Sequence, residues 1–191
     1  FYSNVRKNFQ IFVKDNKPIG DKWSFDEDNR KRVPKGYLSP KSYLFESKYF
    51  EEIKKLIDKF FSNHFGNLEK KIIFPMNFRD SAKVLDNFIK TKLENFGHYE
   101  DFVSTDDLYI NHSLISAPLN MGLITPKQVL DRLSSISYTK VGINNYEGFI
   151  RQVFGWREFM RYLNIHYYED FNKSNFFGND RKLTKHWYEG T

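Results

Sequence analysis

The sequence has 191 residues and a formal net charge of +6, because 30 lysines and arginines outnumber 24 acidic residues. It contains no cysteine, which excludes disulfides, thiolate nucleophiles and cysteine-ligated metal clusters within these residues. It also lacks a run of about eighteen apolar residues, which a membrane-spanning helix needs. We therefore expect one main helical body, in the cytoplasm and without a membrane partner, whose basic balance suits an anionic partner such as nucleic acid.

Aromatic residues are abundant and make up 18% of the chain, including 20 phenylalanines. Some of these rings can stack on nucleic-acid bases or on another planar ligand. A phenylalanine-rich core accounts for the same composition, so both explanations stay open.

The first third of the chain predicts a helix, a linker and a second helix. Apolar residues at four-residue steps predict an opening helix from Phe1, Val5, Phe9 and Val13. The next segment, 14–40, holds three of the six prolines, which is typical of a linker. Its Trp23 and Phe25 indicate that the linker is ordered. The second amphipathic helix is predicted from Phe45, Tyr49, Ile53, Leu56 and Phe60.

Two helices in the middle of the chain have recognisable ends. In the first, Asp80 or Ser81 can cap the start, Gly97 can end the helix, and one face is formed by Val84, Phe88 and Leu93. In the second, Thr125 can accept from backbone N–H groups and Pro126 fits the first helical position. Little alternating strand pattern occurs anywhere, so the sequence predicts an all-α fold.

The segment from Glu147 to Asp170 predicts a long amphipathic helix. Steps of four and three residues form one apolar stripe through Phe149, Val153, Trp156, Met160, Leu163 and Tyr167. The charged residues off this stripe are Arg151, Arg157, Glu158 and Arg161. They form either a solvated face or part of a binding site, and periodicity alone leaves both open.

The segment from Ile110 to Gln128 combines small hydroxyl residues with a turn and a helix start. Ser113 and Ser116 precede Gly122, which allows a tight turn, and Pro126 begins the next helix. Hydroxyls and free N–H groups at a helix start can bind a phosphate. A capped turn without any ligand has the same pattern.

Three motifs in this chain resemble, in the same order, those of the photolyase/cryptochrome family. "HSLISAPLNMGLITPKQ" is similar to the segment by which that family holds the phosphates of FAD, and Trp156 to Phe159 is similar to its Trp-Arg-Glu-Phe helix. "KPIGDKWSFDEDNRK", "FGHYEDF" and "EGFIRQVFGWREFMR" look like the bacterial branch of photolyase-related proteins, the iron–sulfur bacterial cryptochromes and photolyases. The resemblance covers nearly the whole chain.

The resemblance implies that the chain is an internal fragment, the linker plus the first part of a helical FAD-binding domain. Residues 1–14 then form a helix leading out of an N-terminal α/β domain, 15–44 the interdomain linker and 45–191 the truncated N-terminal part of the FAD-binding domain. The antenna-binding α/β domain, the later FAD-cavity helices, a histidine pair used in (6-4) repair and four iron–sulfur cysteines belong outside these residues.

The same resemblance implies two sets of site residues. FAD contacts are expected from Tyr99, His112, Ser113, Leu114, Ile115, Ser116, Trp156 and Arg157. His112 departs from the Thr or Ser of older branches, and a helix-cap role also explains it. Contacts to a lesion in DNA are expected from Asp26, Arg30, Asp101, Gln152 and Trp156. Asp101 can also contribute to a divalent-cation site, although Asp26, Arg30 and Asp101 can equally be solvent-facing charges, and Trp156 a core residue.

By this resemblance the parent is a flavin-dependent DNA photolyase that repairs UV-induced pyrimidine lesions by light-driven electron transfer, with the (6-4) type favoured. It is expected to act on UV-damaged DNA as a monomer, with FAD, a 4Fe-4S cluster and an antenna chromophore as its cofactors. The fragment alone is expected to be inactive. Two alternatives remain, a cryptochrome-type blue-light photoreceptor without repair activity and a cofactor-free helical nucleic-acid-binding module.

Overall fold

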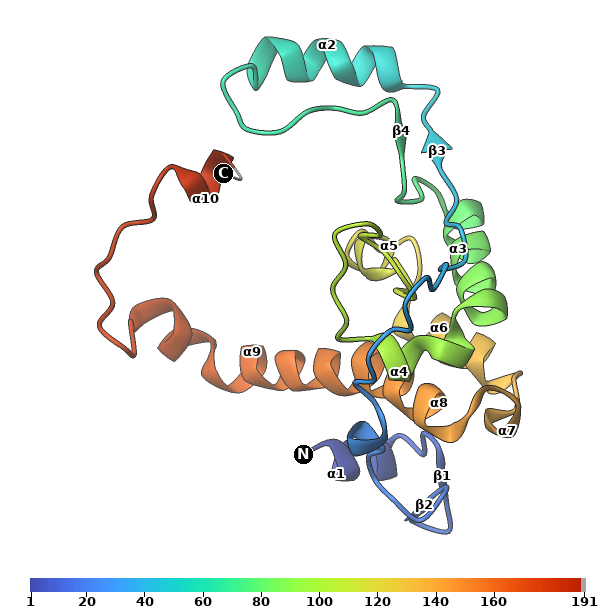
Figure 1. The fold of residues 1–191 in the computed structure, drawn as a ribbon. Helices are drawn as coiled ribbons and strands as arrows, with labels where there is room; N and C mark the ends of the chain where they lie inside the picture. Colours follow the sequence, from blue (N-terminus) through green and yellow to red (C-terminus); the bar gives the residue numbers. More distant parts are fainter. Residues whose placement is uncertain (190–191) are drawn as a thin grey trace.

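The computed structural model describes residues 1–189, and the all-α prediction is confirmed. Figure 1 shows a helical body from which two arms extend. The body contains α3 (Phe78–Thr91), α4 (Phe96–Tyr99), α5 (Ser116–Asn120), α6 (Pro126–Ser134), α7 (Tyr138–Val141) and α8 (Ile143–Ile150). The arms carry α2 (Phe50–Phe60), α9 (Trp156–Lys173) and α10 (His186–Glu189). Gly190 and Thr191, the last residues of the domain expected over 45–191, lie outside the described residues.

Two antiparallel pairs of very short strands occur within residues 1–189, and they do not build a larger sheet. β1 (Val13–Lys14) pairs with β2 (Lys17–Pro18) next to α1 (Tyr2–Asn8). β3 (Phe45–Glu46) pairs with β4 (Lys71–Ile72) at the base of the arm that carries α2. Phe45 therefore lies in a strand, and the second predicted helix begins five residues later, at Phe50.

The opening helix ends earlier than its apolar spacing predicts. α1 stops at Asn8, and Val13 lies in β1. The reason is Arg6, whose fully buried guanidinium donates to the backbone carbonyls of Ile11, Phe12 and Trp23. Those carbonyls can meet one side chain only if the chain turns back after α1. The prediction of a helix over 1–14 is therefore wrong beyond Asn8.

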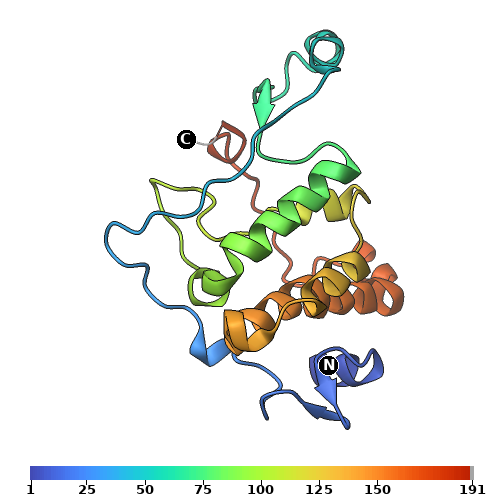
Figure 2. The same ribbon diagram turned by 90° about the vertical axis from the view of Figure 1, so that its right-hand side faces the viewer.

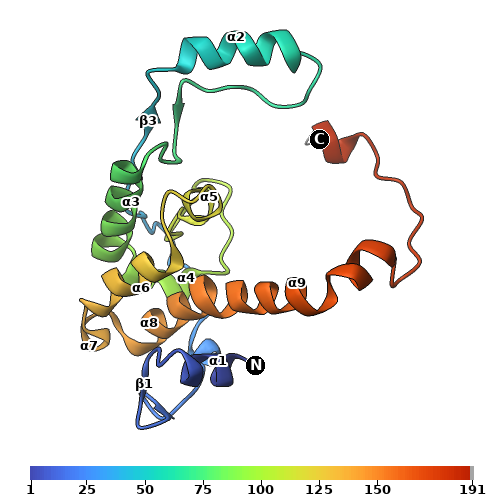
Figure 3. The same cartoon turned by 180° about the vertical axis from the view of Figure 1, so that it is seen from behind.

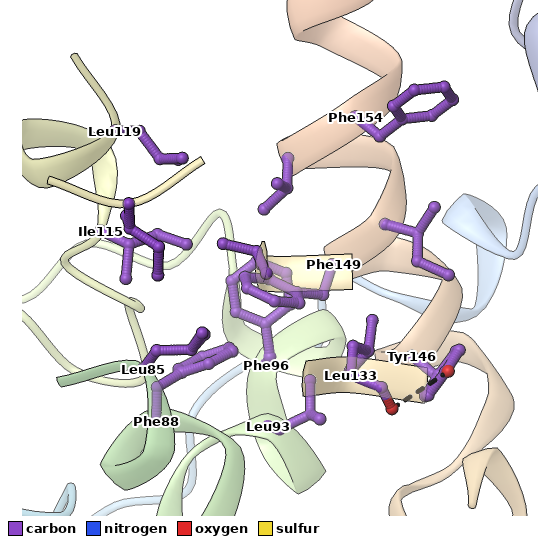
Figure 4. Close-up of a cluster of buried hydrophobic side chains, with 14 of the residues drawn as sticks. Leu85, Phe88, Leu93, Phe96, Ile115, Leu119, Leu133, Tyr146, Phe149 and Phe154 are labelled. Atoms are coloured by element: carbon purple, nitrogen blue, oxygen red, sulfur yellow. Dashed lines mark hydrogen bonds between the residues drawn. The ribbon is translucent and has the colours of Figure 1, made fainter. Parts of the chain in front are cut away.

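The core lies where α3, α4 and α8 meet. Phe88, Phe96 and Phe149 form a ring cluster, with centroid separations of 4.5 Å for Phe88 and Phe149 and 5.3 Å for Phe96 and Phe149. Figure 4 shows Leu85, Leu93, Leu133 and Tyr146 around these rings. Truncating one buried phenylalanine to alanine lowers the free energy of unfolding by about 3–5 kcal/mol. These ring contacts join the three helices to one another.

Both ends of α3 differ from the prediction. Asn77 caps the helix, because its side-chain oxygen accepts from the backbone N–H of Asp80 at 2.9 Å. The helix ends at Thr91, and Gly97 lies inside α4 instead of after α3. A Cβ on Gly97 would lie 2.6 Å from Oδ1 of Asn29 and 3.0 Å from the carbonyl oxygen of Asn144. Gly97 therefore serves a close approach between segments, not a helix end.

The predicted start of the helix over 126–134 is confirmed in full. Thr125 accepts from the backbone N–H of Gln128, whose side chain in turn accepts from the N–H of Thr125. Pro126 occupies the first turn. This capping box satisfies donors that the helix itself cannot.

α8 continues into α9 through a π-helical turn, Arg151–Gly155. Such a turn places one extra residue in the helix, so positions after it are rotated relative to those before it. Phe149 and Val153 are buried, but Trp156 is 54% exposed and Met160 59% exposed. The single buried stripe predicted through this helix is therefore wrong beyond Val153, and every residue of α9 is at least partly exposed.

The linker is ordered along the side of the body, as Trp23 and Phe25 indicate from the sequence. Phe25 is buried, and the one-turn helix η1 (Asp26–Asp28) follows it. Figure 2 shows the linker passing the loop after α4 on its way to the α2 arm. Figure 3 shows that this arm and the C-terminal one lie on the same side of the molecule, where the rings of Phe65 and Tyr188 stack at 5.9 Å.

Candidate functional site

A cavity of about 320 Å³ opens between α4, the start of α5 and the π-helical turn. It is lined by Phe96, Glu100, Asp101, His112, Ser113, Leu114, Ser116 and Gln152. Six of these eight are residues expected at the FAD or lesion contacts. Hollows of about 410 and 530 Å³ lie elsewhere but contain none of the expected residues, so the smaller cavity is the candidate site.

The chain reverses direction beside this cavity at Leu114. Leu114 has a φ of +59°, which is rare for a residue with a branched side chain. Ile115 follows with φ −95° and ψ −1°, in the right-handed region. A left-handed and a right-handed residue in succession point their N–H groups into one concavity, which suits an anion. The side chain of Ile115 is buried in the core, so only its backbone is available to a ligand.

Two hydroxyl groups border the same turn. Ser113 and Ser116 line the cavity, and neither hydroxyl has a hydrogen-bond partner among residues 1–189. Arg157 reaches the far end of α5, where its Nη1 donates to Oδ1 of Asn120 at 3.3 Å. Two free hydroxyls and a turn of backbone N–H groups can together hold a phosphate.

His112 and Tyr99 flank the cavity in different ways. Nε2 of His112 lies 3.2 Å from the backbone oxygen of Glu100. When that nitrogen carries a proton, it donates a hydrogen bond between these two cavity-lining residues. Tyr99 packs against the ring of Tyr37 in the linker, with centroids 5.3 Å apart. Tyr99 is thus next to the cavity wall without being among the residues that line it.

One arginine connects the acidic groups behind the cavity. Arg151 lies 3.0 Å from Asp26, 3.4 Å from Glu147 and 3.5 Å from Glu100. Burial raises the pKa of Glu100, and the positive charge of Arg151 opposes that rise. Nε2 of Gln152 donates to Glu100 at 3.3 Å, which fixes the amide that faces the cavity.

Glu147 attaches the N-terminal segment to this network. Its carboxylate is fully buried and accepts from the hydroxyl of Tyr2 at 3.0 Å and from the backbone N–H of Phe25 at 2.9 Å. Burial, with the charge of Glu147 next, raises the pKa of Tyr2, so the phenol stays protonated and donates. The linker is therefore held against α8 by buried polar groups.

Arg30 lies next to the cavity wall at Asp101. Its guanidinium lies 2.8 Å from Asp26 and 2.9 Å from Asp101, so the structure brings these three predicted residues together. No cluster of three or more His, Asp or Glu side chains able to hold a metal ion occurs in the described part of the chain. The role of Asp101 as a cation ligand stays a prediction.

The structure separates Trp156 from the cavity. Trp156 lines a second hollow of about 260 Å³ on the α1 side, with Phe1, Tyr2 and Phe159. Arg157, one residue later, points to α5. Adjacent side chains of the Trp-Arg-Glu-Phe motif thus lie in different parts of the molecule.

We compared the sequence with those of known proteins. A family model for deoxyribodipyrimidine photo-lyase-related proteins matches residues 1–72. Over its whole length, the chain is 35% identical to a (6-4) photolyase of Agrobacterium fabrum. The chain is thus similar to photolyase-related proteins, and the similarity to the Agrobacterium protein extends over all of its residues. It spans 38% of the length of the Agrobacterium protein. A part equal to 48% of this chain is 43% identical to an uncharacterized protein of Acanthamoeba polyphaga mimivirus, of which it covers 71%.

Four residues of the polar network behind the cavity are absent from the sequence-based site: Tyr2, Glu100, Glu147 and Arg151. One local signal exists, the spacing of four residues that puts Glu147 and Arg151 on one helix face. The contacts to Tyr2 and Glu100 join segments far apart in the sequence, and spacing does not predict them. Among the helices of residues 1–189, none is long and apolar enough to cross a lipid bilayer.

Proposed function

We propose that the complete protein is a flavin-dependent DNA photolyase, of the (6-4) type that the Agrobacterium relative carries in its name, and that this chain supplies part of its FAD and lesion site. The observation that carries the proposal is one cavity lined on one side by the free hydroxyls of Ser113 and Ser116 and the left-handed turn at Leu114. Its other side includes Asp101, which is ion-paired with Arg30. We expect it to act as a monomer in the cytoplasm.

The turn side of the cavity fits the phosphates of FAD. The hydroxyls of Ser113 and Ser116 and the backbone N–H groups at Leu114 and Ile115 are the donors that a phosphate accepts from. Arg157 adds positive charge next to α5. Bound flavin, once reduced and excited by light, supplies the electron that splits the lesion, while the protein binds and orients.

The opposite side of the cavity fits an extruded base. Gln152 presents an amide held by Glu100, and amides pair with the polar edges of bases. Arg30 offers a guanidinium at the outer rim, held by Asp26 and Asp101. A divalent cation at Asp101 would reduce the repulsion between these carboxylates and DNA phosphates. Trp156 is proposed as a stacking surface only outside the cavity.

The division of the chain follows from the same proposal. Residues 1–14 lead out of an upstream domain, 15–44 form the interdomain linker and 45–191 begin the FAD-binding domain. The cysteine ligands of an iron–sulfur cluster in the complete protein would come from other residues, because these 191 contain no cysteine. An antenna chromophore is proposed as a further cofactor of the complete protein.

The hydroxyl pair provides the test. We expect Ser113→Ala with Ser116→Ala in the complete protein to lower flavin content after purification and to weaken flavin binding about tenfold or more, because two donors to phosphate are removed. The matched control is Ser134→Ala with Ser135→Ala, two exposed serines at the end of α6.

Two results would contradict the proposal in different ways. A complete protein that never carries flavin would favour a cofactor-free nucleic-acid-binding module. A flavin-loaded protein that leaves (6-4) and cyclobutane lesions intact under blue light would favour a cryptochrome-type photoreceptor. Light-dependent disappearance of a defined lesion from an oligonucleotide, followed by chromatography, distinguishes these outcomes.

A further inference from the structure

The linker contains a run of unpaired positive charge. Lys31, Arg32, Lys35 and Lys41 lie within eleven residues without an acidic residue between them. All four are exposed, and none has an ion pair among residues 1–189. Arg30 precedes the run but is bound by two carboxylates, so it is not counted.

This basic run is held in place by neighbouring segments. The backbone N–H of Lys31 donates to the carbonyl of His98 at 2.7 Å. The hydroxyl of Tyr37 donates to Oδ1 of Asn111 at 3.0 Å, and Ser39 hydrogen-bonds to Asp107. A positively charged segment that is already ordered loses less conformational entropy on binding than a free tail does.

The anchors also place the basic run beside the candidate site. His98 lies in α4, next to Glu100 and Asp101 of the cavity wall, and Asn111 immediately precedes His112. Figure 2 shows the linker on the same side of the body as the loop that joins α4 to α5. A long polyanion that presents a group to the cavity would therefore pass along these four side chains.

We propose that Lys31, Arg32, Lys35 and Lys41 form a phosphate-binding rim that holds the backbone of duplex DNA next to the cavity. The inference rests on the proposed function in taking DNA as the partner. The contacts are to phosphates, so they add affinity and orientation without reading sequence. They also make binding depend on salt, because each neutralised phosphate releases counterions.

The test compares two variants of the complete protein with equal loss of charge. One carries Gln at 31, 32, 35 and 41, and the control carries Lys14→Gln, Lys17→Gln, Lys55→Gln and Lys140→Gln on β1, β2, α2 and α7. The probe is an undamaged duplex in the dark, followed by fluorescence anisotropy at several salt concentrations. We expect the slope of log affinity against log salt, which is negative, to decrease in magnitude by about 0.9 for each phosphate that the linker variant no longer neutralises, and to stay at the wild-type value in the control.

The outcomes separate this inference from the photolyase proposal, since the assay uses neither light nor a lesion. An unchanged slope in the linker variant, or an equal fall in both variants, would overturn the rim. Lys35→Gln alone should decrease the magnitude of the slope by about 1, which tests the rim in a minimally altered protein. A protein without flavin or repair activity that still shows the linker-specific fall would retain the rim and lose the photolyase proposal.

Discussion

Glu100 is an acid placed where its charge is costly. Its side chain is only 5% exposed, and burial raises its pKa despite the guanidinium of Arg151. An acid whose pKa is raised on folding stabilises the fold while it is protonated, and that contribution is lost as the pH rises through the raised pKa. The cavity wall therefore contains an acid whose burial works against stability at neutral pH.

Replacing Glu100 by glutamine tests this assignment. We expect the free energy of unfolding of Glu100→Gln to increase relative to that of the wild type as the pH rises from 4.5 to 8, because glutamine avoids the cost of a buried carboxylate. Urea unfolding at the two pH values measures the difference. Glu169→Gln, an exposed acid paired with Lys173 on α9, is the control and should show little change. A Glu100→Gln effect that does not vary with pH would refute the role of burial.

Single residues explain which site contacts the sequence could predict. Ser113 and Ser116 are recognisable because a hydroxyl pair before a helix start is a local pattern. The ligand-facing turn depends on the φ of Leu114, which nothing in a leucine side chain indicates. Glu100 is one of several acids after α4 in the sequence, and only the fold brings it to Arg151.

At the scale of elements, α6 shows how much a local pattern can fix. Its capping box uses Thr125 and Gln128, and the helix behind it buries Val129 and Leu133 in the core. We expect Thr125→Ala to lower the free energy of unfolding by about 1 kcal/mol, because an N-cap acceptor is lost. Chemical denaturation measures this loss, and Thr105→Ala, at an exposed position in the loop after α4, is the control.

The elements whose bounds differ from prediction share a physical cause. α3 has several residues able to cap it, and Asn77 is the one whose side chain accepts from the first turn. α1 ends where the carbonyls taken by Arg6 require a turn. Apolar spacing describes one helix at a time, so it predicts that a helix exists more reliably than where contacts from other segments end it.

At the scale of the whole molecule, Glu147 determines whether residues 1–30 stay attached to the helical body. It accepts from Tyr2 and Phe25 and lies beside Arg151, all in a buried environment. We expect Glu147→Ala to lower the free energy of unfolding by about 3–5 kcal/mol, because it leaves Arg151 without one of its buried partners. Hydrogen exchange should show residues 1–30 losing protection before the core of α3 and α8.

The matched control for this prediction is Glu169→Ala, which removes an exposed acid from the ion pair with Lys173 and should cost less than about 1 kcal/mol. Equal protection loss across the whole molecule in Glu147→Ala would mean that the N-terminal segment and the body unfold together. That result would contradict the role of Glu147 as a local attachment.

The π-helical turn also limits how α9 can be compared or redesigned by counting residues. Because the turn adds a residue, a heptad register written from α8 is out of phase by about 100° once it has passed Gly155. Substitutions meant for one side of α9 must be chosen in a register that begins at Trp156. Removing one residue between Arg151 and Gly155 would restore a continuous register and turn Arg157 away from α5.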